Sequence, residues 1–447
     1  MLCEASAPTN FSTIAASFGV GKPVATSRRL RVIFVTFTNL RTAGGTETFL
    51  LNIVRHAPTD RFEVVVVQTD WVDGAGRSDD DVRRLLGRAA LFTLHSYRKT
   101  LDPDKTLSMV SNPGVRDAVR GLVRPWLKLL LSLRVERLSA TLRNLVGPAD
   151  IYYLIDNDDA WHIPKPSGAV ILGSTHCDNL GSSLTRFSLL RNSGLVGLVT
   201  RLVYLGSRLG YLRIDGFHIT NPRLELGRVV HRPSDFTLVL GIDTTVFNPM
   251  GFVPRDGTTR FLFVGRLEKE KGLDLLLDAW VQAAMPTWEL HIVGDGPLLG
   301  RARLLSDQTE GVVLHGRLTT DELAALYRRS DILLVPSASE SYGLVVLEGI
   351  CSGVRVLAST SLKDTFAEFQ RGNIVMFCPP TVNDWARCLR QAGSLSRRDL
   401  EEVSRTFARL SAKYSWKEIA VQFYAQLEVA VGKSMPFRLA ASSSGNT

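Results

Sequence analysis

Cysteine is scarce in this chain of 447 residues, and the spacing of the few cysteines that occur links none of them to another. They have no CxxC pair and no neighbouring histidine cluster, and they are Cys3, Cys177, Cys351, Cys378 and Cys388. This pattern argues against a disulfide-stapled domain and a structural zinc site, and it indicates a reducing compartment. An uninterrupted apolar run of roughly 18 residues, the length that spans a bilayer, is also absent. We therefore expect a cytoplasmic protein that is not integral to a membrane.

Acidic residues are nearly absent from the start of the chain, where Glu4 is the one carboxylate between Met1 and Ser27. This stretch is rich in Ala, Ser and Thr, and it lacks the basic start and compact apolar segment of a signal peptide. We expect residues 1–28 to form a disordered leader, with an organellar transit peptide as the alternative. The polar tail, residues 437–447, is also expected to be disordered.

Carboxylates are missing altogether between Leu180 and Ile214, where arginines alternate with clusters of leucine and valine. The arginines of this basic segment are Arg186, Arg191, Arg201, Arg208 and Arg213. A basic amphipathic helix of this kind can lie in the headgroup region of an anionic membrane, which predicts peripheral attachment to the cytoplasmic face. The alternative is that the leucines pack in the core while the arginines face water.

Positive charge exceeds negative charge over the whole chain, giving a net charge of +9 and an isoelectric point near 9.4. Such a balance favours an anionic partner, which can be a phosphorylated substrate, a membrane lipid or a nucleic acid. Nucleic acid is not expected as a partner, because the sequence has no known binding motif with interleaved aromatic residues.

The first half of the chain shows the pattern of a parallel α/β sheet. A β-branched apolar run begins at Arg29, and a second one follows from Phe62 to Asp70. Between them lie a glycine-containing loop and an apolar-periodic helix from about Glu47 to His56. Strand, glycine loop, helix and strand form the βαβ unit of a doubly wound sheet.

A second series of alternating strands and helices begins near Arg260, after a Pro- and Gly-containing break at Asp243–Gly257. The fold class that we expect is α/β, with two Rossmann-like doubly wound domains facing each other across a cleft. The N-terminal domain is expected at residues 29–243 and the C-terminal domain at residues 258–414.

A pair of glutamates marks the strongest local signal, the sequence ESYGLVVLE from Glu340 to Glu348. It stands where an apolar strand ends and a helix begins, and ligands of open parallel sheets bind at this edge. Gly343 lets the backbone approach a ligand, and the helix that follows offers free N–H groups to a phosphate. Two ordinary solvated glutamates are the alternative.

Two cations and a glycine loop lie at comparable places. Arg266 ends the first strand of the second series, and Lys271 opens the next helix, so both can neutralise a diphosphate without a metal. The alternative for them is a basic surface loop. Gly44 and Gly45, after the first strand of the first domain, form a second candidate loop, although plain turns have the same composition.

These motifs together resemble the large group of retaining glycosyltransferases known as family four, or glycosyl transferases group 1, which have the GT-B architecture. The resemblance covers Leu30–Asp70, His176 and Gly241–Leu427 and is poor in the middle of the first domain. The matching motifs are GGTE (44–47), GIDTTVFNP (241–249), VGRLEKEKG (264–272), IVGDGP (292–297), the helix–strand unit ELAALYRRSDILLVPS (322–337), ESYGLVVLE (340–348) and YSWKEIAVQF (414–423).

The resemblance implies a role for each matching residue. Arg266 and Lys271 bind the diphosphate of the donor, Glu340 hydrogen-bonds the sugar hydroxyls, and Glu348 binds the ribose. The backbone that lines the sugar and the phosphates is that of Ser341, Tyr342, Gly343 and Leu344.

The first domain is implied to close on the donor through Gly44 and Gly45, and His176 approaches the transferred sugar. As a lone histidine, His176 can equally be a packed core residue. Residues 415–432 are implied to cross back to the first domain. The chain departs from the family pattern near Glu368, where family members often have glycines just before this glutamate. The resemblance therefore does not imply that this stretch contacts the donor sugar.

The resemblance further implies transfer from a nucleotide diphosphate sugar to a glycan or lipid-linked acceptor, with retention and without a protein nucleophile. No metal is expected, because the proposed site has no DxD motif at a strand end, and the DNDD cluster at Asp156–Asp159 is interpreted as a solvated loop. The alternatives are another GT-B enzyme, such as an epimerase, and a catalytically silent sugar-binding subunit. A phosphorylase would need a pyridoxal-binding lysine, for which no motif is visible.

Overall fold

The computed structural model describes residues 28–36, 40, 45–69, 79–94, most of 144–175, 210–220 and 232–251 of the N-terminal half. In the C-terminal half it describes residues 257–434 except 284–286, 339, 341 and 397. At the start of these residues, the guanidinium of Arg28 donates to both carboxylate oxygens of Asp150, at 2.6 and 3.0 Å.

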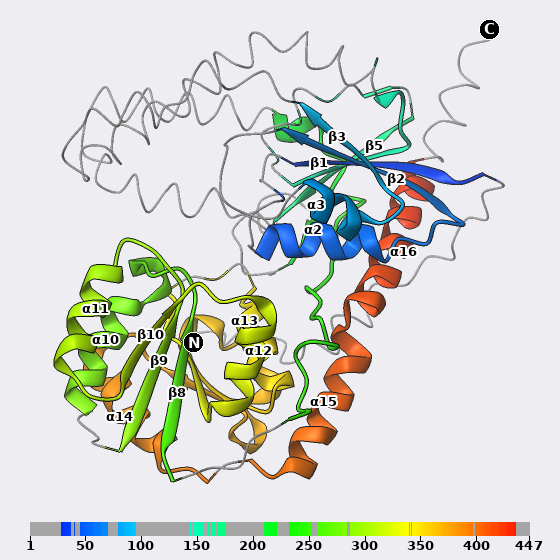
Figure 1. Ribbon diagram of the computed structural model, residues 1–447. Helices are drawn as coiled ribbons and strands as arrows, with labels where there is room; N and C mark the ends of the chain where they lie inside the picture. The colour runs from blue at the N-terminus through cyan, green and yellow to red at the C-terminus, as the bar shows by residue number, and fades with distance from the viewer. Residues whose placement is uncertain are drawn as a thin grey trace, which may run out of the picture.

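The N-terminal domain is built on a seven-stranded parallel sheet with the order β3-β2-β1-β4-β5-β6-β7 (Figure 1). Its strands are β1 (Leu30–Thr36), β2 (Phe62–Thr69), β3 (Ala90–Leu94), β4 (Ile151–Leu154), β5 (Val170–Ser174), β6 (Gly216–Ile219) and β7 (Phe236–Thr237). Its described helices include α2 (Gly45–Arg55) and α3 (Asp79–Leu86). Strands β1, β4 and β5 are almost wholly buried, which explains why they are continuous apolar runs in the sequence.

The C-terminal domain has a six-stranded parallel sheet with the order β10-β9-β8-β11-β12-β13. Its strands are β8 (Thr259–Val264), β9 (Trp288–Val293), β10 (Val312–Gly316), β11 (Ile332–Val335), β12 (Arg355–Ser359) and β13 (Val375–Cys378). Its helices are α10 (Leu273–Ala283), α11 (Leu299–Gln308), α12 (Thr320–Arg329), α13 (Leu344–Cys351), α14 (Val382–Gly393) and α15 (Leu400–Tyr414). The predicted α/β class with two doubly wound domains is confirmed.

The strand order reverses between β8 and β11, because the chain moves outward to β9 and β10 and then returns beside β8. Open parallel sheets bind their ligands at such a switch point, outside the carboxyl ends of the strands. The loop that begins at Gly265 follows β8, and the loop that holds Glu340 follows β11. The topology therefore brings both loops to the same edge of the sheet.

Helices cover both faces of the second sheet. On one face, α10 buries Trp280 beside Phe261 of β8 and Trp288 of β9, and α14 buries Trp385 in the same apolar cluster. On the other, α12 and α13 pack against the side chains of Leu262 and Leu333. The start of α12 is fixed by a capping box, in which Thr319 and Glu322 each accept from the other's backbone N–H.

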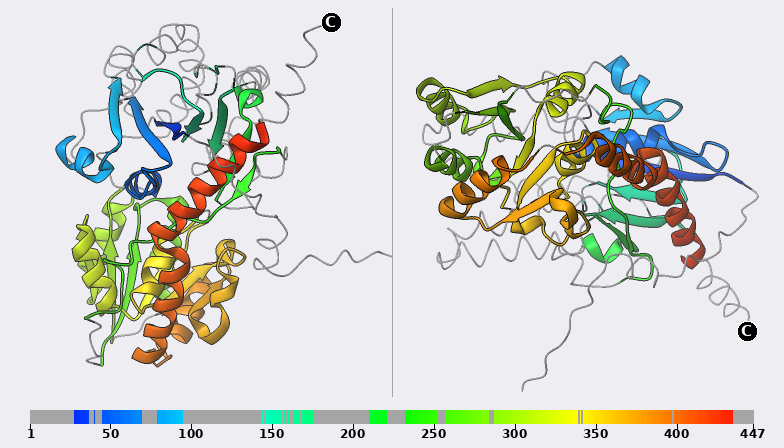
Figure 2. Two further views of the ribbon diagram at one scale, coloured as in Figure 1. Left: turned by 90° about the vertical axis from the view of Figure 1, so that its right-hand side faces the viewer. Right: turned by 90° about the horizontal axis from the view of Figure 1, so that it is seen from below.

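The last helix of the described residues connects the two domains. Helix α15 packs against α13 of the C-terminal domain, and α16 (Trp416–Ser434) continues onto the N-terminal domain, where it contacts α2 (Figures 1 and 2). At the junction, the backbone of Ile242 pairs with that of Tyr414 and Trp416. The segment that leaves the first domain and the helix that returns to it are therefore bound to each other.

A buried histidine lies in the core of the N-terminal domain, under α16. His218 Nε2 is 2.9 Å from the carbonyl oxygen of Leu238 and must donate to it, so Nδ1 accepts from the hydroxyl of Tyr153 at 2.7 Å. Four phenylalanine rings surround this pair, those of Phe34, Phe49, Phe236 and Phe423. Burial in these apolar surroundings lowers the pKa of His218 to about 4.

The lowered pKa of His218 predicts acid sensitivity. The pKa of His218 in the folded protein lies below its unfolded value of 6.5. The contribution of neutral His218 to stability is therefore fully present above pH 6.5 and is lost as the pH falls toward 4. The loss is about 3 kcal/mol of unfolding free energy, from about 1.4 kcal/mol per pKa unit. Urea unfolding of the wild type and of His218→Asn, which cannot titrate, measures it. The difference in unfolding free energy between the wild type and the variant should narrow from pH 7 to pH 4. A constant difference would contradict the lowered pKa of His218.

Candidate functional site at the carboxyl edge of the second sheet

The centre of the candidate site is an ion pair between two residues that the sequence analysis selected. Lys271 Nζ donates to Glu340 Oε1 at 2.7 Å, and the hydroxyl of Ser337 donates to the same oxygen at 2.7 Å. The Glu340 side chain is only 11% exposed, and that of Lys271 is 25% exposed. The carboxylate is thus held by two donors and lies in a fixed position at the end of β11.

Backbone contacts explain why the two loops meet. The amide of Ala338 donates to the carbonyl oxygen of Glu270 at 3.0 Å, which joins the loop after β11 to the 3-10 turn η4 (Lys269–Lys271). Gly272 follows this turn with φ of 70°, and a Cβ there would lie 2.3 Å from the carbonyl oxygen of Pro336. Only glycine combines this left-handed conformation with so close a contact, so Gly272 fixes the approach of Lys271 to Glu340.

Arg266 lies apart from this pair. Its side chain is 72% exposed and forms an ion pair with Glu268 at 2.7 Å. Exposed pairs of this kind contribute little to stability, so a phosphate can attract the guanidinium away from Glu268. The structure therefore places the two predicted cations on one loop but does not bring them to the same partner.

The motif IVGDGP supplies a third loop to this edge. The Gly294 amide donates to the carbonyl oxygen of Gly316, and a Cβ on Gly294 would lie 1.9 Å from the carbonyl oxygen of Gly265. Gly296 packs against the backbone of Leu267, where a Cβ would lie 2.7 Å from the carbonyl oxygen. The glycines thus let the loops after β8 and β9 pack directly on each other, and the Gly294 amide joins them to the end of β10.

The start of α13 carries the predicted donor-binding backbone. Gly343 caps the helix with φ of 87°, and Tyr342 is buried against Phe366, with ring centroids 5.8 Å apart. Gly45, at the start of α2, faces this point, because a Cβ there would lie 4.0 Å from the side chain of Leu344. The first turns of the two helices, one from each domain, therefore meet where the resemblance implies the phosphates to lie.

Three predicted site residues, Gly44, His176 and Ser341, lie outside the described residues. So do Asp156, Asp158 and Asp159 of the DNDD cluster, whereas Asn157 is buried and bonds to the backbone of Ser174. Most of the basic segment is outside as well. Of its described part, Arg213 donates to the carbonyl oxygen of Ile163 at 2.8 Å.

Glu348 lies on α13 and faces α12. The hydroxyl of Tyr327 donates to Glu348 Oε2 at 3.0 Å. The residue is partly exposed, but burial of its carboxyl group raises the pKa of Glu348 to about 7, and the bond from Tyr327 opposes this rise. The structure thus gives Glu348 a partner and a titration near neutral pH that the sequence analysis did not predict.

Glu368, at the departure from the family pattern, lies on a 3-10 turn near the end of α15. The hydroxyl of Tyr414 donates to its carboxylate at 2.6 Å, and Lys413 Nζ lies 3.2 Å from the same oxygen. Half of the Glu368 side chain remains exposed. Its partners come from the end of α15, the helix that leads to the crossing segment, so Glu368 attaches its 3-10 turn to that helix.

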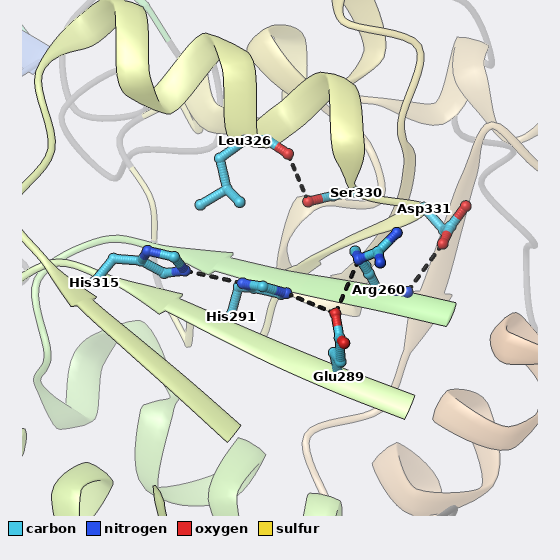
Figure 3. Close-up of polar contacts among 7 residues, drawn as sticks. All are labelled: Arg260, Glu289, His291, His315, Leu326, Ser330 and Asp331. Atoms are coloured by element: carbon cyan, nitrogen blue, oxygen red, sulfur yellow. Dashed lines mark hydrogen bonds and ion pairs between the residues drawn. The ribbon is translucent and has the colours of Figure 1, made fainter. Parts of the chain in front are cut away.

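A second polar row, which the sequence analysis also missed, crosses strands β10, β9 and β8 beneath α12 (Figure 3). His291 Nε2 lies 3.2 Å from a carboxylate oxygen of Glu289 and donates to it, and His291 Nδ1 shares a hydrogen bond with His315 Nε2 at 2.9 Å. Arg260 donates to the same oxygen of Glu289 at 2.9 Å, and its amide donates to Asp331. Burial and the neighbouring His291 lower the pKa of His315. This row ties three strands together on the face that α12 covers.

Among the described residues, no group of three or more histidine, cysteine, aspartate or glutamate side chains is arranged to hold a metal ion. In the same part of the chain, no helix is long and apolar enough to cross a membrane. The absence of a metal from the reaction therefore stays a prediction.

Comparison with known proteins supports the sequence resemblance. Residues 258–393 match the family model described as glycosyl transferases group 1. The sulfoquinovosyl transferase SQD2 of Arabidopsis thaliana is 30% identical over 237 residues, which are 44% of this chain and 45% of that protein. The D-inositol 3-phosphate glycosyltransferase of Arthrobacter sp. is 33% identical over 175 residues, 34% of this chain and 41% of that one. The chain thus spans less than half the length of these curated relatives.

Solved structures match nearly the whole chain. The sucrose-phosphate synthase of Thermosynechococcus elongatus has a TM-score of 0.64 at 16% identity and covers 90% of this chain and 100% of its own. The Anabaena protein Alr3699/HepE, in complex with UDP and glucose, has a TM-score of 0.60 at 14% identity, with the same two coverages. At these identities the likeness shows the fold, which is GT-B. Residues 258–393 therefore match the family of glycosyl transferases group 1, within a chain that has the two-domain GT-B fold.

Proposed function

We propose that this protein is a glycosyltransferase that moves a sugar from a nucleotide diphosphate sugar to an acceptor, with retention of configuration. The observation that carries the proposal is the fixed Lys271–Glu340 pair at the switch point of the second sheet. Support comes from the relatives, which are named as glycosyltransferases, and from the Anabaena structure, which contains UDP and glucose.

Each side chain has a task that its geometry suits. Both bonds to Glu340 are made to Oε1, and we assign Oε2 to a hydroxyl of the donor sugar. Lys271 lies beside that carboxylate and faces the charge that develops on the leaving diphosphate, which Arg266 approaches from the adjacent loop. Retention is assigned to a front-face reaction in which the leaving phosphate assists deprotonation of the acceptor, so no protein nucleophile takes part.

The acceptor is assigned to the N-terminal domain and is a lipid-linked acceptor or a growing glycan. This assignment is motivated by the basic segment Leu180–Ile214, which has no carboxylate. Each basic residue near an anionic membrane surface contributes about 1 kcal/mol of attraction. Co-sedimentation with anionic liposomes, with Arg191, Arg201 and Arg208 changed to Glu as the comparison, tests the membrane contact. A wild type that stays in the supernatant at low salt favours a soluble acceptor.

A panel of sugar nucleotides tests the proposed function directly. Thermal shift and turnover are measured with uridine and guanosine diphosphate sugars, each with and without an acceptor extract. Transfer of the sugar supports the proposal. Conversion of the donor to an isomeric sugar nucleotide would instead show an epimerase, and binding without turnover would show a silent sugar-binding subunit.

Metal independence is a separate prediction of the same site. Because Lys271 and Arg266 supply the positive charge for the diphosphate, we expect activity with excess EDTA to equal activity without it. Turnover is measured with EDTA and then with added Mg²⁺ or Mn²⁺. Loss of activity that either ion restores would show that a divalent cation is needed, and Asp156–Asp159 would then be the first ligands to test.

A further inference from the structure

We propose that Tyr327 is a positioning residue of the donor site, holding the Glu348 carboxylate toward the ribose hydroxyls and connecting it to the segment between the domains. This proposal rests on the proposed function. It extends that function to a residue of the helix–strand motif to which the sequence assigned no role, one that is on α12 and fully buried.

The contact between the two side chains is direct. Tyr327 Oη is 3.0 Å from Glu348 Oε2, and the phenol reaches it from the last turn of α12 across to α13. A phenol donates one proton, so it fixes one carboxylate oxygen and leaves the other to accept from a ligand. A carboxylate with one oxygen fixed loses less rotational freedom on binding a ribose than a solvated glutamate does.

The ring of Tyr327 also contacts the segment between the domains. Phe247 is buried against it, with ring centroids 5.8 Å apart and the planes nearly perpendicular. The neighbouring Arg328 donates to the carbonyl oxygen of Val246 at 3.4 Å. The end of α12 is thus attached to the segment just after residue 243, where the chain passes from one domain to the other.

The hydrogen bond also affects the charge of Glu348. Among the described residues, the titratable groups that act with this carboxyl are the Tyr327 phenol and the Cys351 thiol. The Tyr327 bond lowers the pKa of Glu348 against the effect of burial, which alone would raise it further. Burial and the charge of Glu348 raise the pKa of Cys351 to about 12, so that thiol stays neutral at physiological pH. Tyr327 therefore keeps Glu348 more ionised near pH 7, and a carboxylate is the better acceptor for two ribose hydroxyls.

The test uses Tyr327→Phe, which keeps the ring against Phe247 and removes only the hydroxyl. Binding of UDP and GDP to the full chain is measured by calorimetry from pH 6 to pH 9. We expect the variant to bind the preferred nucleotide about tenfold more weakly at pH 7, because it loses a hydrogen bond to a charged group. Its binding should recover at higher pH, as Glu348 ionises there, and Glu348→Gln should show no such recovery.

The ribose contact has its own comparison. A 2′,3′-dideoxy nucleoside diphosphate lacks the hydroxyls, so Tyr327→Phe should change its affinity less than twofold. Tyr424→Phe is the matched control, since Tyr424 is as buried but donates to the backbone of Ile53 in the other domain. If Tyr327→Phe loses equal affinity for the ribose and dideoxy nucleotides, the proposal is overturned. The same holds if the pH dependence of nucleotide binding is unchanged in Tyr327→Phe.

A measurement without ligand separates this proposal from the proposed function. The pKa of Glu348 is raised from 4.5 in the unfolded chain to about 7, so the wild type loses stability as the pH rises through 7. In Tyr327→Phe this loss should extend to higher pH, and in Glu348→Gln it should disappear. If the wild type binds neither nucleotide, the proposed function fails, and the positioning role fails with it. An identical stability profile of Tyr327→Phe and wild type would overturn the positioning role alone.

Discussion

Glu340→Gln is expected to lower sugar transfer by about 10²-fold or more while the fold survives. The substitution keeps the size of the side chain but removes the charge that pairs with Lys271 at 2.7 Å. An amide also holds a sugar hydroxyl less firmly than a carboxylate does. Turnover with the preferred donor measures the effect, and thermal unfolding shows whether the protein still folds.

Removal of both Arg266 and Lys271 should weaken donor binding more than removal of either Glu340 or Glu348. The double variant Arg266→Ala with Lys271→Ala removes both charges that face the diphosphate, so we expect the donor to bind much more weakly. Lys269→Ala is the matched control, because it removes the same charge from an exposed position in the same turn. Near-wild-type turnover of the double variant would contradict the assignment of the site.

The second large effect is expected in the crossing helix. Phe423 is fully buried, and its ring centroid lies between 5.2 and 6.1 Å from those of five aromatic residues of the N-terminal sheet and α2. They are Phe34, Phe49, Tyr153, His218 and Phe236. Phe423→Ala should reduce the free energy of unfolding by about 3–5 kcal/mol, because it leaves a cavity among large rings.

A residue two positions away provides the control for Phe423. Val421 lies on the same helix and is 51% exposed, so Val421→Ala should change stability by less than about 0.5 kcal/mol. Urea unfolding of both variants makes the comparison. Equal effects of the two substitutions would mean that α16 is not anchored through the aromatic cluster.

The sequence was most informative where local pattern and topology agree. The apolar runs of β1 and β8 are strands whose side chains are buried on both faces of their sheets. The helices that alternate with such strands then require parallel connections. The glycines of IVGDGP and Lys271-Gly272 were recognisable as loops at strand ends. Since carboxyl ends of parallel strands share an edge, the sequence also predicted which loops lie near one another.

The partners of those residues were beyond the sequence. Ser337 and Tyr327 lie in the matching helix–strand motif, but the sequence assigned them no role, because a serine after a strand and a tyrosine on an amphipathic helix are ordinary residues in those places. The row of Arg260, Glu289 and His291 was missed for a related reason. Alternate residues of a strand lie on one face, but the sequence does not tell which positions of neighbouring strands are in register.

The sequence by itself determined the class of the fold, the order of its two halves, the loops that carry Glu340 and Lys271, and the helix that carries Glu348. These features depend on periodicity and on glycine at particular places. Only the tertiary structure decided that Lys271 contacts Glu340 across 69 positions of chain, and that Arg266 stays with Glu268. It also decided the charge behaviour of Glu348. A pKa depends on burial and on the neighbours of the carboxyl group, and residues distant in sequence supply both.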